Sequence, residues 1–208
     1  MYHELLRDAS FWTFLFSVDQ DIAQRCRSKG CPCGGHLHCA DYPRKPKGVP
    51  RQELPEQYRY RLSFCCCRDG CRKRVTPPSV RFLGRKVYLF AVVILVSAMR
   101  QGPTPRRVRE LSKLFYADRR TIARWRVFWN EHFPRTKFWN VRRARFVPVV
   151  NIMDFPRSLL EAFVRSGDDR QEWEKLLCFL SPITTANGLE IKVSADGQKS
   201  AENGRRRS

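Results

Sequence analysis

Two groups of closely spaced cysteines constrain most narrowly what this chain can fold into. The first is Cys31-Pro-Cys33-Gly-Gly, and the second is Cys65-Cys66-Cys67 with Cys71 four residues later; roughly 30 residues separate the groups. Two cysteines close in sequence can form a tight turn whose thiolates converge, and neighbouring glycines permit the tight backbone. Two such turns supply the four sulfur ligands of a tetrahedral zinc site. The pattern therefore predicts a zinc ribbon with one structural Zn²⁺ that contributes to folding.

Strand parity selects among the candidate ligands of this predicted site. Residues 58–64 alternate strictly, which predicts a half-buried strand with Tyr58, Tyr60, Leu62 and Phe64 facing inward. Continuing the alternation puts Cys66 inward and its two cysteine neighbours outward. The preferred ligands are therefore Cys31, Cys33, Cys66 and Cys71. Alternatives stay open at this point: Cys67 for Cys66, a member of the first pair replaced by His36, His38 or Cys39, or a set of free thiols without a metal.

The positive charge lies almost entirely in the middle of the chain. The protein has 40 Lys and Arg against 20 Asp and Glu, a formal net charge of +20. Residues 72–146 hold 20 basic and 3 acidic groups, a net +17, whereas residues 1–71 have +3 and residues 147–208 have zero. Such a concentration indicates a polyanionic partner, either nucleic acid or an anionic membrane. A second basic feature lies outside this stretch, in the proline-rich loop at 42–48. This loop either contacts DNA phosphates or the minor groove, or it is a solvated linker.

A membrane-spanning segment is not predicted. The longest apolar run, at 87–99, has 13 residues, whereas a spanning helix needs about 20. A buried core helix is the better interpretation of this run. Because the N-terminus lacks the pattern of a secretory signal, we expect a cytoplasmic protein associated with the nucleoid.

The basic segment contains a pattern typical of a helix-turn-helix. Val108, Leu111 and Leu114 follow helical spacing within 105–115, and apolar residues from Ile122 to Phe133 form a stripe along a second helix at 118–133. Asp118 is suited to cap the second helix after a short turn. A recognition helix presents its outer face to the DNA major groove.

The candidate DNA contacts are polar residues on these two helices. Arg120 and Arg124 lie opposite the apolar stripe, with Arg119 and Thr121 flanking them. Arginine can bond guanine through two hydrogen bonds, and threonine can reach a base or a phosphate. The full set is Arg106, Arg107, Arg119, Arg120, Thr121 and Arg124. The alternative is an ordinary helical hairpin with solvated arginines.

The two motifs resemble the N-terminal part of bacterial insertion-sequence transposases and their accessory proteins. Leu111–Trp125 is similar to the helix-turn-helix of transposases, resolvases and their regulators. Cys31-Pro-Cys33-Gly-Gly with Cys66–Arg74 resembles the zinc ribbon at the front of some of these transposases. The resemblance implies an accessory or regulatory protein of a transposable element, with a separately encoded transposase or recombinase as a candidate partner.

The predicted function is non-catalytic, sequence-specific binding of double-stranded DNA. The acidic residues after 147 fall in two short helical segments and a tail, and about 60 residues cannot make the ribonuclease-H-like domain of a transposase. The sequence also contains no P-loop pattern. The alternatives are a transcriptional regulator unrelated to transposition and an RNA-binding or nuclease-associated ribonucleoprotein subunit.

The expected fold is mainly α with a small β zinc ribbon and a helix-turn-helix bundle. Its expected parts are an amphipathic helix at 1–29, the zinc ribbon at 30–80, the helix-turn-helix domain at 81–146, a small helical extension at 147–194 and a disordered tail at 195–208. Asp19 and Asp21 of the first helix are expected to be solvated. The extension is a candidate homodimer interface.

Overall fold

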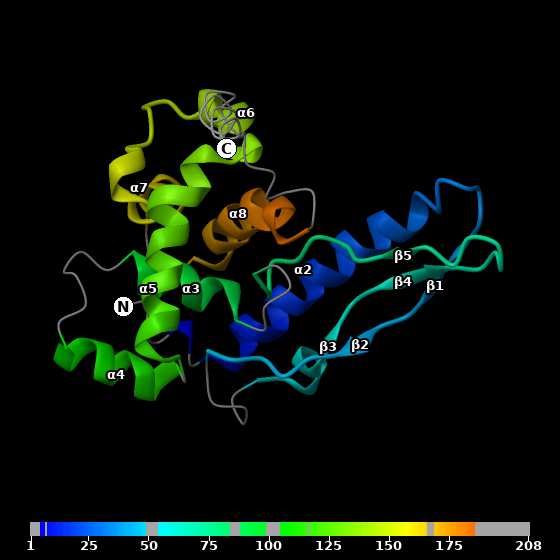
Figure 1. Cartoon of the computed structure of the whole chain (residues 1–208), viewed down its shortest axis with the longest axis horizontal. Helices are drawn as coiled ribbons and strands as arrows, with labels where there is room; N and C mark the ends of the chain where they lie inside the picture. The colour runs from blue at the N-terminus through cyan, green and yellow to red at the C-terminus, as the bar shows by residue number, and fades with distance from the viewer. Residues whose placement is uncertain are drawn as a thin grey trace, which may run out of the picture.

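The computed structural model describes residues 5–6, 8–48, 54–83, 88–98, 105–115, 117–165 and 169–185. These residues are mostly helical with a small antiparallel sheet, which confirms the expected mainly α class. The molecule is elongated (Figure 1): most helices gather at one end, and a long helix runs beside the strands toward the other end. The tail predicted at 195–208 lies outside the described residues.

The helices are α2 (Ala9–Ser28), α3 (Phe90–Ser97), α4 (Pro105–Phe115), α5 (Arg119–Val127), α6 (Lys137–Arg142), α7 (Arg157–Phe163) and α8 (Arg170–Leu180). Except for α6, they lie in segments that the sequence predicts to be helical, and the helix predicted over 118–133 continues past α5 as a π-helical turn at Phe128–His132. All of α3 is buried, as expected for the central apolar run. Within the described ranges, no helix combines the length and apolar character needed to cross a membrane.

The strands form two small antiparallel sheets between α2 and α3 in the sequence. They are β1 (Leu37–Cys39), β2 (Tyr42–Pro43), β3 (Tyr60–Arg61), β4 (Phe64–Cys66) and β5 (Arg74–Val75). The larger sheet has the order β1-β4-β5, with Leu37 opposite Cys66 and Phe64 opposite Val75. In the smaller sheet β2 pairs with β3. The strands lie along one side of α2 (Figure 1).

The single strand predicted over residues 58–64 is wrong in its first part. A 3₁₀ turn at Glu56–Arg59 precedes β3, and this turn shifts the side-chain parity. Tyr60 is therefore exposed, whereas Arg61 is buried and donates a hydrogen bond to the Pro77 carbonyl oxygen at 2.6 Å. From Phe64 onward the predicted parity holds, and both Phe64 and Cys66 are buried.

Aromatic side chains fill the core between the helices. Trp12, Trp129, Trp139 and Trp173 are all fully buried. Phe11 of α2 contacts Trp173 of α8 at a ring separation of 6.2 Å, so the first and last helices pack together. Burial of such large rings is the main source of stability for this part of the chain.

A buried ion pair joins the strands to the helical body, contrary to the solvated Asp19 that the helical pattern predicts. Asp19 is 1% exposed and Arg81 is fully buried. Arg81 Nε donates to the Asp19 carboxylate at 2.7 Å, and the Val80 backbone N–H and Ser79 hydroxyl donate at 2.6 Å each. The rest of the Arg81 guanidinium donates to backbone carbonyl oxygens of Gln57 at 3.0 Å and Tyr60 at 3.4 Å. Helical periodicity could not predict this partner because it lies 62 residues away.

Asp19→Ala should lower the free energy of unfolding by about 3–5 kcal/mol, because it leaves the Arg81 charge buried without its partner. Asp21 lies on the same helix but is exposed. Asp21→Ala should therefore change stability by less than about 0.5 kcal/mol. Urea unfolding of both variants measures the difference. Equal effects would show that the ion pair does not hold the two parts together.

Candidate metal centre and nucleic-acid interface

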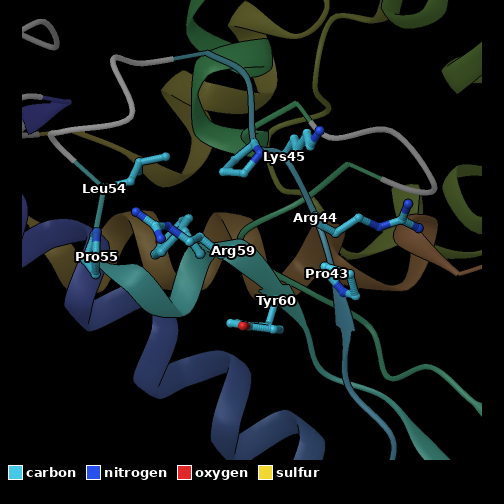
Figure 2. Close-up of a pocket in the computed structure, with 9 residues that line it drawn as sticks. Pro43, Arg44, Lys45, Leu54, Pro55, Arg59 and Tyr60 are labelled. Carbon is cyan, nitrogen blue, oxygen red and sulfur yellow. The ribbon is translucent and has the colours of Figure 1, made fainter.

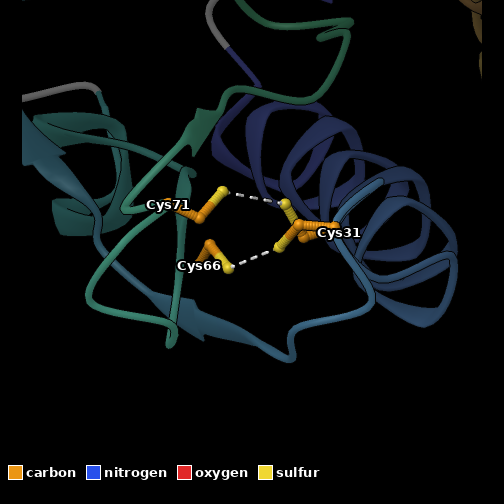
Figure 3. Close-up of side chains that lie close together, drawn as sticks. Cys31, Cys66 and Cys71 are labelled. Carbon is orange, nitrogen blue, oxygen red and sulfur yellow. Dashed lines mark hydrogen bonds between the residues drawn. The ribbon is translucent and has the colours of Figure 1, made fainter.

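Four cysteines converge beyond the C-terminal end of α2, and Figure 1 shows this end of α2 on the side of the molecule away from α4 and α5. Cys31 and Cys33 follow the end of α2, Cys66 ends β4, and Cys71 lies in the turn before β5 (Figure 3). Their four Sγ atoms all lie within 4.8 Å of one another. These are the four residues that the sequence selected, and together they could hold a metal ion.

The spacing of the sulfur atoms suits tetrahedral coordination. A Zn–S bond of about 2.3 Å requires sulfurs about 3.8 Å apart. The Sγ atoms of Cys31 and Cys71 are 3.7 Å apart, and those of Cys33 and Cys66 are 3.4 Å apart. A set of four sulfur donors is compatible with a structural zinc site, which is closed to other ligands.

Two glycines allow the first cysteine turn to approach the second. Gly34 has a φ of +78°, which favours glycine. A Cβ atom on Gly35 would lie 2.6 Å from the Cys66 Sγ atom, so any side chain there would displace this sulfur. Arg68 further joins the turns, because its guanidinium donates to the Cys33 carbonyl oxygen at 2.6 Å.

Backbone N–H groups prepare one of the thiols for ionisation. The N–H of Gly35, followed by the thiol of Cys66, lowers the pKa of Cys33 to about 6. The N–H of Arg68 lowers the pKa of Cys66, but burial and bonds to neighbouring thiols outweigh it and raise this pKa to about 12. Cys33 therefore ionises more readily than Cys66, and a metal would displace the protons that the cluster retains.

The structure places the alternative ligands outside this cluster. Because Leu37 pairs with Cys66, His38 stands opposite Cys65 on the other face of the sheet. His36, His38 and Cys39 are exposed, and Cys65 and Cys67 are partly exposed. Strand register thus separates His38 and Cys65 from the cluster, whereas Cys39 shares the sheet face of Cys66 but pairs with Phe64 and is exposed.

Helix α5 presents arginines on the face opposite its buried side. Ile122 and Trp125 pack into the core, whereas Arg119, Arg120 and Arg124 are exposed. The Asp118 carboxylate caps the helix by accepting from the Thr121 backbone N–H at 2.7 Å. That bond, and to a lesser extent the charge of Arg124, lowers the pKa of Asp118. Figure 1 shows α4 crossing beside the N-terminal end of α5.

Thr121 is a correction to the predicted contacts. It is only 2% exposed, and its hydroxyl donates to Asp118 at 3.2 Å, accepts from Arg124 at 2.9 Å and lies 3.3 Å from the Tyr88 hydroxyl. A hydroxyl held in this way positions Arg124 and is not available to a base. The sequence contains a signal for this burial. Asp118 caps the helix, and the side chain of the third residue after a cap, here Thr121, lies back toward the capping residue.

The first helix of the pair is only partly described. Arg106 is exposed and forms a surface ion pair with Glu110 at 3.2 Å. The side chains of Arg107, Leu111 and Leu114 lie outside the described residues. Arg106 is thus placed where a partner could reach it.

Sequence reasoning missed a basic pocket beside the smaller sheet. It has a volume of about 380 Å³ and lies between residues 43–46 and 54–60. Figure 2 shows Leu54 and Pro55 on one side, Pro43 and Arg44 on the other, and the Tyr60 ring below Arg59. The basic loop at 42–48 indicates one side of this pocket. The other side is missed because the strand predicted over 58–64 places Tyr60 on the inward face.

Comparisons with family models, with curated proteins and with solved structures each gave no match.

Gly35→Ala should weaken metal binding by about 10- to 100-fold, the usual loss when a group that orients a ligand is disturbed. Gly70 is the matched control, because a Cβ atom there would meet nothing within 4 Å. Gly70→Ala should bind metal as the unchanged protein does. Competition between each variant and a chelator measures the affinity. A Gly35→Ala variant with unchanged affinity would contradict the assigned cluster.

Proposed function

We propose that the protein binds double-stranded DNA in a sequence-specific, non-catalytic manner, with α4 and α5 acting as a helix-turn-helix. The observation that carries this proposal is the exposed face of α5. Arg120 and Arg124 stand on this face, and Ile122 and Trp125 anchor the other face in the core. A short, capped helix with arginines at its N-terminal outer face suits the major groove, where arginine bonds guanine O6 and N7.

The side chain of Arg124 is held before any DNA arrives. Its guanidinium donates to the Thr121 hydroxyl, which in turn donates to the capping Asp118. Fixing an arginine in advance reduces the entropy that binding would cost. Arg119 and Arg106 are exposed nearby and would contact phosphates, which position a protein without reading sequence.

In this proposal a structural Zn²⁺ holds the ribbon together. Cys31, Cys33, Cys66 and Cys71 would bind it, and four thiolates with no open position would give it a folding role rather than a catalytic one. The ribbon sheet also carries exposed arginines, such as Arg74 on β5, so the metal would order part of the basic surface.

The mobile-element role remains part of the proposal. It is supported by the likeness of the cysteine pairs and of Leu111–Trp125 to the front of insertion-sequence transposases. In that role the protein would bind element DNA beside a separately encoded transposase or recombinase. A transcriptional regulator would show the same DNA binding but no such partner, so copurification with the product of a neighbouring recombinase gene separates the two.

Arg120→Ala and Arg124→Ala should each reduce discrimination between the preferred DNA site and a mutated one by about 1–3 kcal/mol. Arg25→Ala is the matched control, because it removes an equal charge from an exposed position on α2. It should leave discrimination unchanged. Fluorescence anisotropy with both duplexes measures the ratio. Equal losses on both DNA sequences would make the α5 arginines phosphate contacts only.

The affinity for duplex DNA should fall steeply with salt. Neutralising about 6–8 phosphates gives a slope of roughly −5 to −7 in a plot of log affinity against log salt concentration. Titrations at several salt concentrations measure this slope. An affinity that does not change with salt would contradict binding through the basic segment.

A further inference from the structure

The basic pocket beside β2 and β3 has the features of a nucleotide site. Arg44, Lys45 and Arg59 contribute three cations to its lining, and no carboxylate lines it within the described part of the chain. Arg59 does pair with Glu56 at 3.8 Å, but both side chains are largely exposed. Such a pair is weak, so a phosphate could replace the glutamate.

Tyr60 supplies an unused aromatic ring at this pocket. It is 47% exposed and is the one aromatic among the exposed large hydrophobic residues that the structure describes. Tyr42, on the paired strand, differs because guanidinium groups of Arg44 and Arg74 already lie over its ring, 4.5 and 5.5 Å from its centroid. Tyr60 is therefore the ring that a flat ligand could stack on, with Arg59 beside it (Figure 2).

Direct contacts connect this pocket to α5. The chain leaves the pocket through Lys47, whose carbonyl oxygen accepts from the Leu89 backbone N–H at 3.0 Å. Lys47 also forms an isolated parallel β-bridge with Tyr88. The Tyr88 ring packs on Trp125 of α5, with the ring centroids 4.9 Å apart. Gly48, with a φ of +127°, packs against Val92 of α3. The pocket and the arginine face of α5 thus share one rigid support.

We propose that this pocket binds an unpaired nucleotide of a strand that continues from the duplex on α5. The proposal rests on the proposed function for the duplex part. Bases inside a duplex keep both faces stacked, so only an unpaired base can stack on Tyr60. Arg59 would bind a phosphate next to that base, and Lys45 would add positive charge to the lining. The preferred substrate is a duplex with a single-stranded extension, rather than a blunt duplex.

The test compares the full-length protein on a blunt mixed-sequence duplex and on the same duplex with an oligothymidylate extension. One stacked base should raise the affinity about 5- to 100-fold. Tyr60→Ala should abolish this gain without changing affinity for the blunt duplex, and Tyr60→Phe should keep it because the ring remains. No gain in the unchanged protein, or a gain that survives Tyr60→Ala, would overturn the proposal.

Two further binding measurements distinguish the pocket from the duplex site. Oligothymidylate and oligouridylate alone should each bind in a manner that depends on Tyr60 but not on Arg120, and their ratio reports whether the strand is DNA or RNA. If duplex binding fails while this dependence holds, the proposed function is wrong and the pocket stands. If binding of neither oligonucleotide depends on Tyr60, the pocket proposal is wrong.

Photo-crosslinking of an iodouracil base in the extension should label Tyr60. Unfolding curves of the variants confirm that they fold.

Discussion

Four cysteine side chains converge at one end of the larger sheet, and in our proposal the strands there depend on the metal ion that these cysteines could hold. Among the described residues, the buried hydrophobic cluster at this end consists of Ala23, Leu37 and Phe64 besides Cys31 and Cys66, with Leu62 and Val75 partly buried against it. A core this small cannot offset the conformational entropy of the loops around it. Coordination of four thiolates by one ion would supply the missing stability, because its binding free energy becomes folding free energy. The requirement for glycine at position 35 follows from the same constraint, since the first turn passes directly over the Cys66 sulfur.

The ribbon and the helices act as one frame because Asp19 and Arg81 join them. Their side chains are buried, so the pair is retained through many hydrogen bonds rather than through charge alone. From this junction the chain continues into α3 and then into α4 and α5. The Lys47 and Tyr88 contacts bring the smaller sheet to the same helices. The cysteine cluster at one end and the arginine face at the other therefore hold their positions through packing and need no contact with each other.

The sequence predicts those parts of the fold that depend on local spacing. The central apolar run locates α3, helical periodicity locates α4 and α5, and the capping aspartate places the start of α5. The four converging cysteines are also identified correctly, because strand parity is valid from Phe64 onward. Long-range contacts cannot be predicted from local spacing. The partner of Asp19 lies 62 residues away, and the 3₁₀ turn before β3, which exposes Tyr60 and buries Arg61, leaves no periodic signal. Thr121 is a third case. Its position beside the exposed face of α5 predicts an exposed side chain, but its hydrogen bond to the capping Asp118 carboxylate holds it in a buried position.

X-ray absorption spectroscopy at the zinc edge identifies the atoms bound to the ion in the purified protein. We expect one zinc per chain, surrounded by four sulfur atoms at about 2.3 Å and bound by no nitrogen or oxygen atom. Nitrogen ligands would show that a histidine such as His36 or His38 replaces a cysteine, although both side chains are exposed and lie outside the four-sulfur cluster. That result, or a purified and folded protein without metal, would contradict coordination by the four cysteines.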